Sequence, residues 1–342
     1  MFLVVQIVCV SKVSIMALTL TLAISEYEHV SDLTTGRVVP EGFRLNCLSL
    51  PIEEIFFRFI HYREWDVTEL SFAKYLAMRA AGDTSIIALP VFPSRVCRHS
   101  SIYVRRGGIT EPAQLAGARV GLPEWAQTAA IYSRALLTHE WGIPLQDVEW
   151  YQAGVNEPGR AEKVRIHLPD GVRLTAVPDR SLDAMLLDGE VDAVFSARPP
   201  RSLADGNSDV VRLFPEFEGI EREYVRRTGI FPIMHVIALR SEVLDEHPWV
   251  AMNLLEAFEE AKQRSVARLT DITASRVPLP WGASRMDEAK ALFGDDPWPY
   301  GVEANRTTLE SFIRFAWEQG VIAERLEPEA LFPPQVLTRY RV

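Results

Sequence analysis

The regular succession of strand-like and helical runs is the feature that most limits what this chain can fold into. Short apolar runs typical of strands, such as Leu18–Ser25 and Ala118–Leu122, alternate with longer runs of helical periodicity, such as Pro51–His61 and Pro248–Leu269. Two parallel strands need a crossover connection between them, and that connection is usually a helix. The alternation therefore predicts an α/β fold.

The length of the chain adds a division into two lobes. At 342 residues it exceeds what one hydrophobic core usually supports. A first α/β unit runs to the break after Arg106, and a second ends near Gly229, after which the chain returns with a strand and helices. The order predicts a discontinuous first lobe (16–106 and 230–342), a second lobe (107–229) and a cleft between them. Ligands of open α/β sheets bind beyond the carboxyl ends of the strands.

The N-terminal residues Met1–Ile15 are mostly apolar but do not have the pattern of a signal peptide. No Lys or Arg precedes the apolar run, Lys12 interrupts it, and it passes directly into the first predicted strand. We expect an upstream extension over residues 1–15 and a working start at Met16. No apolar stretch elsewhere in the sequence reaches the roughly 20 residues that span a bilayer.

Charge and cysteine content restrict the partners and the compartment. Lys and Arg number 36 against 46 Asp and Glu, a net charge of -10, which argues against a nucleic-acid partner but not against a small anion. The cysteines, Cys9, Cys47 and Cys97, are odd in number and widely spaced, so neither a zinc site nor a disulfide framework is indicated. A reducing compartment, the cytoplasm, is the expected location.

Four arginines lie in segments that follow predicted strands. Arg95 and Arg98 share one loop with Ser94, and Arg160 and Arg198 lie in two later loops. A guanidinium group matches a carboxylate bidentately, so a pair of them suits a dicarboxylate. The same arginines would also serve as surface partners of acidic side chains, and the residues alone leave both roles open.

Three titratable side chains are candidates for proton transfer. His99 follows Arg98 in the arginine-containing loop. Glu69 lies at the start of a predicted helix (Leu70–Ala81), where a negative charge is favourable without any further role. If Glu69 were buried in the cleft, its pKa would rise and it could hold a proton at neutral pH. His235, inside an apolar strand-like run, fits a core histidine better than a catalyst.

Two aromatic residues, Tyr27 and Trp125, follow predicted strands and could stack on a planar ligand, although a core or lid role suits each equally well. The sequence contains no phosphate-binding GxxxxGK[ST], dinucleotide-binding GxGxxG after a strand, GxSxG or HExxH. Nucleotide-binding, Rossmann, α/β-hydrolase and zincin interpretations therefore lose their main support.

Several collinear motifs together resemble the 4,5-dihydroxyphthalate decarboxylase family. Segment 65–105 carries Asp-Val-Thr-Glu-Leu-Ser and Pro-Val-Phe-Pro-Ser-Arg followed by Arg-His-Ser. Further matches are Gly121–Thr128, Pro158–Arg160, Ser196–Pro200, His247–Ala251, Asp296–Gly301 and Gln319–Gly320. The resemblance covers nearly all of the chain from Met16 onward. It implies a type II periplasmic-binding-protein-like fold, with two α/β lobes, a hinge and a central cleft.

The resemblance also implies a function. The expected reaction is the non-oxidative decarboxylation of an aromatic dicarboxylate, 4,5-dihydroxyphthalate, to protocatechuate and CO2 in phthalate catabolism. The protein would then be a carboxy-lyase. Most members of the wider superfamily are solute-binding proteins, so a non-catalytic binding protein for an aromatic carboxylate is the main alternative. A related enzyme that acts on another aromatic acid is a second one.

The chemistry of this reaction suggests roles for the candidate residues. Protonation of the ring carbon that bears the carboxylate gives a dienone, from which CO2 leaves, so no organic cofactor is needed. A divalent metal at the catechol end stays open, although no ligand spacing argues for one. We expect a carboxylate clamp, an acid or base, and aromatic side chains beside the ring. The assignments are Arg95, Arg98, Arg160 and Arg198 with Ser94 for the clamp, His99 or Glu69 for proton transfer, Trp125 and Tyr27 beside the ring, and His235 as a further contact.

The C-terminal third is rich in aromatic residues on predicted helices. A core role is favoured for them, with a subunit interface in a homo-oligomer as the alternative. The residues concerned are Trp298, Tyr300, Phe312, Phe315 and Trp317.

Overall fold

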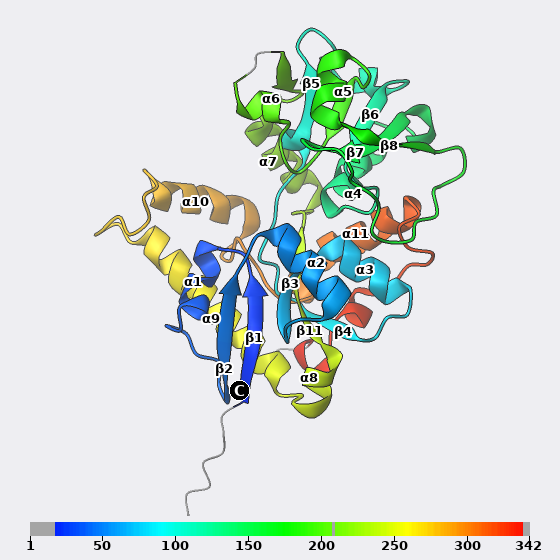
Figure 1. The fold of residues 1–342 in the computed structure, drawn as a ribbon. Coiled ribbons are helices and arrows are strands. Elements are labelled where there is room, and N and C mark those ends of the chain that lie inside the picture. The colour runs from blue at the N-terminus through cyan, green and yellow to red at the C-terminus, as the bar shows by residue number, and fades with distance from the viewer. Residues whose placement is uncertain (1–17, 207–208, 338–342) are drawn as a thin grey trace, which may run out of the picture.

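A computed structural model describes residues 18–206 and 209–337 of the chain. The backbone forms two α/β lobes, one above the other in Figure 1, joined by extended crossover segments. The expected two-lobe α/β fold is therefore confirmed. The predicted extension over residues 1–15 and the start at Met16 lie outside the described residues.

The first lobe is built on a five-stranded sheet of order β2-β1-β3-β11-β4. Strand β1 pairs in parallel with β2 on one side and with β3 on the other, while β11 runs antiparallel between β3 and β4. Because β11 is antiparallel, its first residue lies at the edge where β1, β3 and β4 end. The strands are β1 (Leu18–Ile24), β2 (Phe43–Ser49), β3 (Val67–Ser71), β4 (Ile86–Leu89) and β11 (His235–Arg240).

The second lobe contains a six-stranded sheet of order β10-β5-β9-β6-β7-β8. Strand β6 pairs in parallel with β9 and β7, whereas β5 runs antiparallel to β9 and β10. The strands are β5 (Ile102–Arg105), β6 (Arg119–Leu122), β7 (Glu149–Gly154), β8 (Arg173–Ser181), β9 (Ala193–Phe195) and β10 (Val210–Arg212).

One predicted boundary needs correction. The first unit was expected to run to residue 106, but β5 already belongs to the second sheet, so the chain has crossed between the lobes before Ile102. The short apolar run of β5 looks like any strand of the first lobe. Its membership is decided by antiparallel pairing with β9, some 90 residues later, which local sequence does not reveal.

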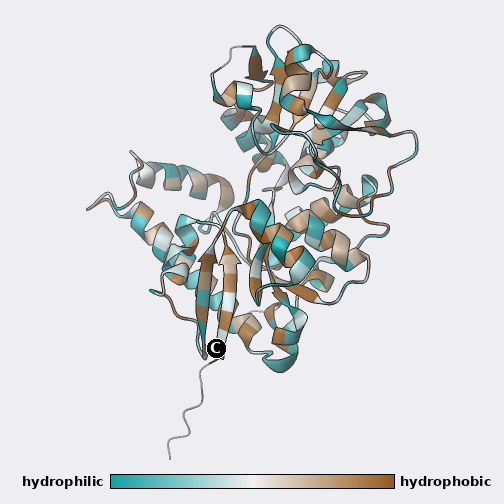
Figure 2. Cartoon of the chain, in the orientation of Figure 1, coloured by the Kyte–Doolittle hydropathy of each residue, from teal (hydrophilic) through white to brown (hydrophobic). Residues whose placement is uncertain are grey.

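Helices cover both sheets, and hydrophobic residues are concentrated on the strands and on the inner faces of the helices (Figure 2). In α2, for example, Ile55 and Phe59 are buried one turn apart, while Glu54, Phe57 and His61 are exposed. The helices are α1 (Ser31–Thr34), α2 (Ile52–Tyr62), α3 (Phe72–Ala80), α4 (Thr128–Ala135), α5 (Leu182–Asp188), α6 (Arg201–Ala204), α7 (Phe217–Thr228), α8 (Ser241–Glu246), α9 (Val250–Thr270), α10 (Gly282–Phe293) and α11 (Arg306–Glu318). None of the helices in these described segments is both long and apolar enough to cross a membrane.

The hydrophobic core does not stop at the boundary between the lobes. Helix α4, which follows strand β6 of the second sheet, packs against α11 of the first lobe, with Tyr132 over Phe312 at 4.9 Å between ring centroids. The aromatic residues Tyr300, Phe312 and Phe315 are buried there, as expected, while Trp317 remains 42% exposed. A subunit interface at Trp317 stays a prediction.

Each sheet has one point at which its strand order reverses. The chain leaves β1 for β2 on one side and then returns to β3 on the other, and the same reversal occurs around β6, between β7 and β9. Loops at such a point diverge and leave room for a ligand. Figure 1 shows the two lobes facing each other across these loops.

Candidate functional site

Three side chains of the first lobe meet where β1 and β3 end and β11 begins. Glu69 on β3 is fully buried, and its Oε1 accepts hydrogen bonds from the Tyr27 hydroxyl at 2.5 Å and from His235 Nδ1 at 2.6 Å. Its Oε2 accepts the backbone N–H of Ser25 at 2.9 Å. We call Tyr27, Glu69 and His235 the acid–base cluster.

The strand register explains this convergence and corrects one prediction. Glu69 was expected at a helix start, but it lies within β3, directly opposite Ile237 of β11. His235 lies opposite Ser71, so Glu69 and His235 are diagonal neighbours on one face of the sheet. Pairing with β11 extends the strand to Ser71, and helix α3 begins only at Phe72.

The electrostatics of Glu69 also differ from expectation. Burial alone would raise its pKa, but the hydrogen bonds and charge of His235 outweigh burial and hold the pKa below its usual value. Glu69 is therefore an ionised hydrogen-bond acceptor at neutral pH and not a reservoir for a proton. Burial raises the pKa of Tyr27, with the charge of Glu69 adding to it, so the tyrosine stays protonated and donates.

His235 is the member of the cluster that can exchange a proton with a ligand. Its Nδ1 is committed to Glu69, whereas Nε2 has no hydrogen-bond partner among the described residues and 16% of the side chain is exposed. The ring of Phe56 on α2 packs edge-on against it at 5.0 Å between centroids. A buried carboxylate that fixes one imidazole nitrogen leaves the other as acid or base. The prediction of His235 as a mere contact therefore undervalues it.

A second, ionic cluster joins the two lobes. Lys74 Nζ on α3 lies 2.8 Å from Glu124, which follows β6, and 2.9 Å from Glu162. Glu124 also pairs with Arg160 at 2.6 Å and with Lys163 at 3.5 Å. Burial would raise the pKa of Glu124, but the three cations outweigh it and keep the pKa below its usual value. Arg160, predicted for the carboxylate clamp, is thus bound to a protein carboxylate.

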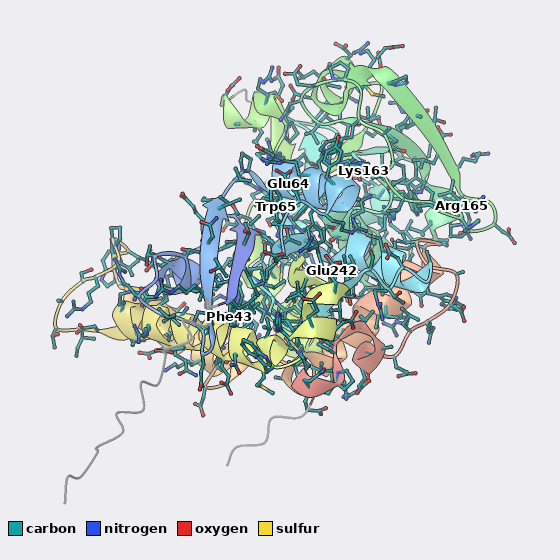
Figure 3. The ribbon with its side chains drawn as sticks, turned by 60° about the horizontal axis from the view of Figure 1, so that its bottom comes forward. Phe43, Glu64, Trp65, Lys163, Arg165 and Glu242 are labelled. Carbon is teal, nitrogen blue, oxygen red and sulfur yellow. The ribbon has the colours of Figure 1, made fainter. Side chains whose placement is uncertain are left out.

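The connection between β7 and β8 supplies three of these charges and continues as a strap to the C-terminal helix. The His167 backbone N–H donates to Gly320 O at 2.8 Å. Gly320 has φ +68°, and a Cβ there would lie 1.6 Å from His167 O, so only glycine fits. Val164 and Ile166 pack against the core, while Arg165 points outward (Figure 3). The strap therefore holds Arg160 and Lys163 against Glu124.

The other predicted arginines have different surroundings. Arg95 is buried, and its guanidinium donates to the carbonyl oxygens of Phe231 and Pro299 at 3.0 and 2.8 Å and to Asn305. These bonds assign Arg95 to holding the segment before β11 against Pro299 and Asn305, and its role in substrate binding stays a prediction. Its neighbour Ser94 approaches the Tyr27 hydroxyl of the acid–base cluster.

Arg98 is buried without an acidic partner. Its Nη1 donates to Ser101 Oγ at 3.3 Å and its Nη2 contacts Met234 Sδ at 2.6 Å, while Nε has no partner. Burial lowers the pKa of Arg98 to about 10, which leaves it charged at neutral pH. Within the described residues no carboxylate lies at ion-pair distance from it, and an uncompensated buried charge is costly. The surroundings of Arg98 therefore favour an anionic ligand.

His99 does not join the acid–base cluster. It lies in the short helix η2 (His99–Ser101), where the rings of Trp141, Phe214 and Tyr224 surround it at centroid distances of 6.4, 5.9 and 5.3 Å. Its Nδ1 is buried without a partner. Burial, with a smaller effect from the charge of Arg227, lowers the pKa of His99 to about 4. A histidine that is neutral at pH 7 has no cationic proton to donate, so these surroundings do not favour His99 as the general acid, and its part in proton transfer stays a prediction.

Replacing His99 by phenylalanine should flatten the acid side of the stability profile. The folded-state pKa of about 4 lies below the unfolded value of 6.5, so the unfolded chain binds the extra proton between these values. Stability therefore falls as the pH decreases through this window, by roughly 2 kcal/mol between pH 6.5 and pH 5 from this group. Urea unfolding of both proteins at pH 7 and pH 5 measures the difference. An equal offset at the two pH values would contradict the assignment.

Trp125 also lies elsewhere than predicted. Its side chain is fully buried, its indole N–H donates to Gln319 O at 2.7 Å, and the guanidinium of Arg134 stacks 3.8 Å from the ring. The ring of Trp150 packs perpendicular to it at 5.5 Å. The indole therefore has no free face for a ligand and instead anchors the second lobe on the C-terminal helix.

Several polar groups at the lobe interface were not among the predicted site residues. Lys74 carries a signal that could have found it, because a cation in the first turn of a helix opposes the helix dipole. Ser71 Oγ and Thr128 Oγ1 meet across the interface at 3.0 Å. Gln127 Oε1 and Ser196 Oγ, beside the strand reversal of the second sheet, are buried without partners. Unpaired buried polar atoms of this kind are ready partners for a ligand.

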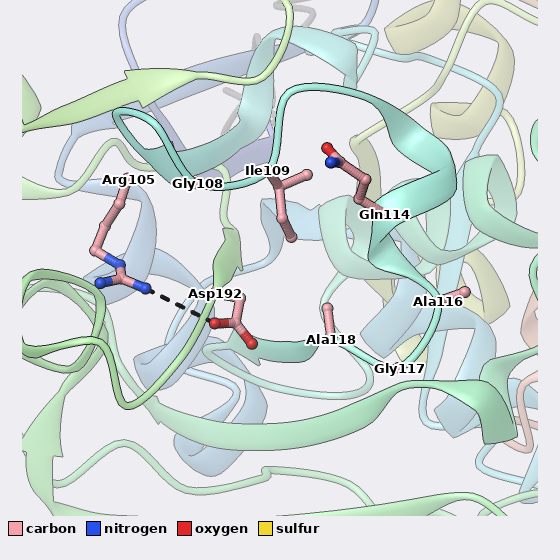
Figure 4. Close-up of a pocket in the computed structure, with 8 residues that line it drawn as sticks. All are labelled: Arg105, Gly108, Ile109, Gln114, Ala116, Gly117, Ala118 and Asp192. Atoms are coloured by element: carbon pink, nitrogen blue, oxygen red, sulfur yellow. Dashed lines mark ion pairs between the residues drawn. The ribbon is translucent and has the colours of Figure 1, made fainter.

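A cavity of about 300 Å³ lies away from this site (Figure 4). Arg105 and Asp192, 3.8 Å apart, line it together with Gly108, Ile109 and Gln114. It lies where β6 and β9 begin, at the edge of the sheet opposite the strand ends that usually bind ligands. In the described part of the chain, no three His, Cys, Asp or Glu side chains group as metal ligands.

The sequence comparisons single out one enzyme family. No protein-family model matches the chain. A 4,5-dihydroxyphthalate decarboxylase from Comamonas testosteroni is 36% identical over 327 residues, which cover 95% of this chain and 99% of that protein. A second 4,5-dihydroxyphthalate decarboxylase, from Pseudomonas putida, is 37% identical over 211 residues, 61% of this chain and 82% of that protein.

Solved structures agree on the fold. The periplasmic aliphatic sulphonate-binding protein SsuA from Escherichia coli has a TM-score of 0.53 at 14% identity, covering 94% of this chain and 99% of that one. A periplasmic sulfonate-binding protein from Methylobacillus flagellatus has a TM-score of 0.54 at 12% identity, covering 93% and 92%. These neighbours identify a periplasmic-binding-protein-like fold. The 36% sequence identity over 99% of the Comamonas enzyme identifies the family within that fold. The chain belongs to the 4,5-dihydroxyphthalate decarboxylase family of carboxy-lyases.

Proposed function

We propose that this protein removes one carboxylate from 4,5-dihydroxyphthalate and yields protocatechuate and CO2. The observation that carries the proposal is the buried, ionised Glu69 that holds His235 Nδ1 at 2.6 Å and leaves Nε2 to face a ligand. The identity with the Comamonas enzyme along 327 residues supports the substrate.

The substrate chemistry defines what the site must do. Each carboxylate of 4,5-dihydroxyphthalate is para to a hydroxyl group. Direct loss of CO2 would leave an aryl carbanion, so protonation of the carbon that bears the carboxylate must come first. The para hydroxyl, as it loses its proton to water, supplies the electron pair for that new C–H bond and the ring becomes a dienone. The C–CO2 bond then breaks, its electrons restore the aromatic ring, and the oxygen regains its proton.

In this scheme His235 is the proton donor to the ring carbon. Its protonated Nε2 gives up the proton, and Glu69, ionised and only 2.6 Å from Nδ1, stabilises the imidazolium before the transfer. Tyr27 donates to the same Glu69 oxygen and fixes its orientation. The reaction consumes one proton for each CO2 released, which His235 regains from solvent through its partly exposed edge.

Arg98 is the best-placed group to bind the carboxylate that stays on the ring. It is buried, charged and without an acidic partner, and its contact Met234 directly precedes His235. Ser94, which approaches the Tyr27 hydroxyl and whose carbonyl oxygen accepts the Met234 N–H at 2.8 Å, links the two regions. Firm binding of the retained carboxylate can offset the cost of desolvating the one that leaves.

A role as a non-catalytic solute-binding protein is not favoured. The named relatives are decarboxylases, and a protein that only binds an aromatic carboxylate has no need of a buried Glu–His pair. We further propose that the protein works in the cytoplasm. Cys47 and Cys97 are both free thiols, which suits a reducing compartment. Fractionation of cells that express the native chain would test this location.

Incubation of purified protein with 4,5-dihydroxyphthalate tests the function directly. We expect protocatechuate and CO2 to form in equal amounts, with protocatechuate followed by chromatography and CO2 by trapping. Phthalate, which lacks both hydroxyl groups, cannot form the dienone and should bind without turnover. Absence of protocatechuate at substrate-saturating concentration would refute the proposed function.

A further inference from the structure

One exposed ion pair joins the two lobes on the side of the acid–base cluster. Arg198, in the loop after β9, donates from Nη2 to Glu53 Oε2 at 2.6 Å, and Glu53 lies in the first turn of α2. The two side chains are 68% and 41% exposed. Within the described residues Arg198 makes no other hydrogen bond or ion pair, so most donors of its guanidinium remain free.

The pair lies close to the proposed proton donor. Residues three apart on a helix share a face, so Glu53 and Phe56 project from the same side of α2. The ring of Phe56 packs on His235 with 5.0 Å between centroids. Arg198 therefore reaches the first lobe about one helical turn along α2 from Phe56, the residue whose ring packs on His235.

Arg198 can change partner at a much lower cost than Arg95 or Arg160. Arg95 is buried and bound to the carbonyl oxygens of Phe231 and Pro299, and Arg160 is held by the almost inaccessible Glu124. An exposed ion pair, in contrast, contributes little to stability. The group that Arg198 binds is itself a carboxylate, the same group that a substrate of the proposed class carries twice.

We propose that Glu53 is a built-in competitor for the substrate: in the empty protein its carboxylate occupies Arg198, and one carboxylate of the aromatic dicarboxylate takes its place. This inference rests on the proposed substrate class. It assigns Arg198 to binding a carboxylate of the substrate and Glu53 to holding the Arg198 guanidinium when the substrate is absent. Exchange of one carboxylate for the other leaves the charge balance of the guanidinium unchanged and frees the first turn of α2 at the same time.

Phthalate binding measured by calorimetry tests the exchange without turnover. Glu53→Gln should bind phthalate about 2- to 5-fold more tightly than the wild type, the range that loss of an exposed ion pair allows. Arg198→Ala should bind it roughly 10-fold more weakly or worse, since a charge-assisted contact is lost. In the double variant Glu53→Gln/Arg198→Ala, the affinity should equal that of Arg198→Ala, because no competitor remains to be removed.

Glu54→Gln is the matched control. It removes the same charge from the same turn of α2, but it releases Arg58, which retains its partner Glu64. Phthalate affinity should stay at the wild-type value in this variant. A similar gain in Glu54→Gln would show a general charge effect and overturn the inference.

Three other results would also overturn it: unchanged affinity in Glu53→Gln, weaker binding in that variant, or no phthalate binding by the wild type. Weaker binding would mean that Glu53 positions Arg198 and does not compete with the substrate. The phthalate-binding result is independent of the test of the proposed function, which measures protocatechuate formation by the wild type. Tighter phthalate binding by Glu53→Gln without any turnover of 4,5-dihydroxyphthalate would refute the function alone.

Discussion

Replacement of His235 by glutamine is expected to lower kcat for decarboxylation by about 10²- to 10⁴-fold, the usual contribution of a positioned acid or base. Glutamine retains the size and hydrogen-bonding capacity needed to contact Glu69, but it cannot deliver a proton at neutral pH. The effect should fall on kcat, with KM changed little, because His235 acts on the ring carbon and not on the carboxylates. Steady-state kinetics on protocatechuate formation measure both values.

Glu69→Gln is a second test of the Glu69–His235 pair. Its amide cannot balance an imidazolium, so kcat should fall and the pH–rate profile should shift, whereas a purely structural role would leave the profile in place. His61→Gln, on the outer face of α2, is the matched histidine control and should retain wild-type kinetics. Wild-type kcat in His235→Gln would disprove the assigned proton donor.

Substitution of Glu124 by glutamine should destabilise the protein by about 3 kcal/mol, the lower end of the range for breaking a buried ion pair. The change leaves Lys74, Arg160 and Lys163 around a neutral amide, and only Glu162 remains to balance them. The loss is moderated because about a third of the Arg160 and Lys163 side chains is exposed. Urea unfolding at pH 7 measures the change in free energy.

The double variant Lys74→Met/Glu124→Gln separates the energy of the ion pair between the two side chains from the energy of their other contacts. Removing both partners lowers by one the excess positive charge that Glu124→Gln leaves, so the cost of the double variant should be at least 1 kcal/mol smaller than the sum of the two single costs. Glu157→Gln breaks the exposed pair with Arg201 at 2.5 Å and should cost less than about 1 kcal/mol. Strict additivity of the two single variants would show that Lys74 and Glu124 do not interact in solution.

The fold was largely predictable because its signals are local. The alternating Leu and Thr of Leu18–Ile24 predicts a half-buried strand, and the glycine that directly follows the predicted helix Leu70–Ala81, Gly82, adopts φ +84° just after the end of α3. The membership of β5 was not predictable, because antiparallel pairing with β9 depends on residues far along the chain. The same long-range pairing converts Glu69 from a helix start into a strand residue.

The site was predictable in residue identity more than in role. Tyr27, Glu69 and His235 were all singled out, yet only the register of β3 against β11 brings them together, and no motif spacing encodes that register. The four arginines look alike in the sequence because each follows a strand. Their surroundings separate them: carbonyl oxygens around Arg95, Ser101 and Met234 beside Arg98, the buried Glu124 beside Arg160 and the exposed Glu53 beside Arg198.

The contact between α4 and α11 determines how the lobes can move apart. Trp125 and Arg134 both bind Gln319 at the end of α11, so we expect the side of the interface near α3 to act as the pivot of a rotation. The loop that bears Arg198, in contrast, meets α2 through one exposed ion pair with Glu53, a contact that contributes little to stability. We therefore expect the two lobes to separate asymmetrically, first at the contact between Arg198 and Glu53 and last at the contact between α4 and α11.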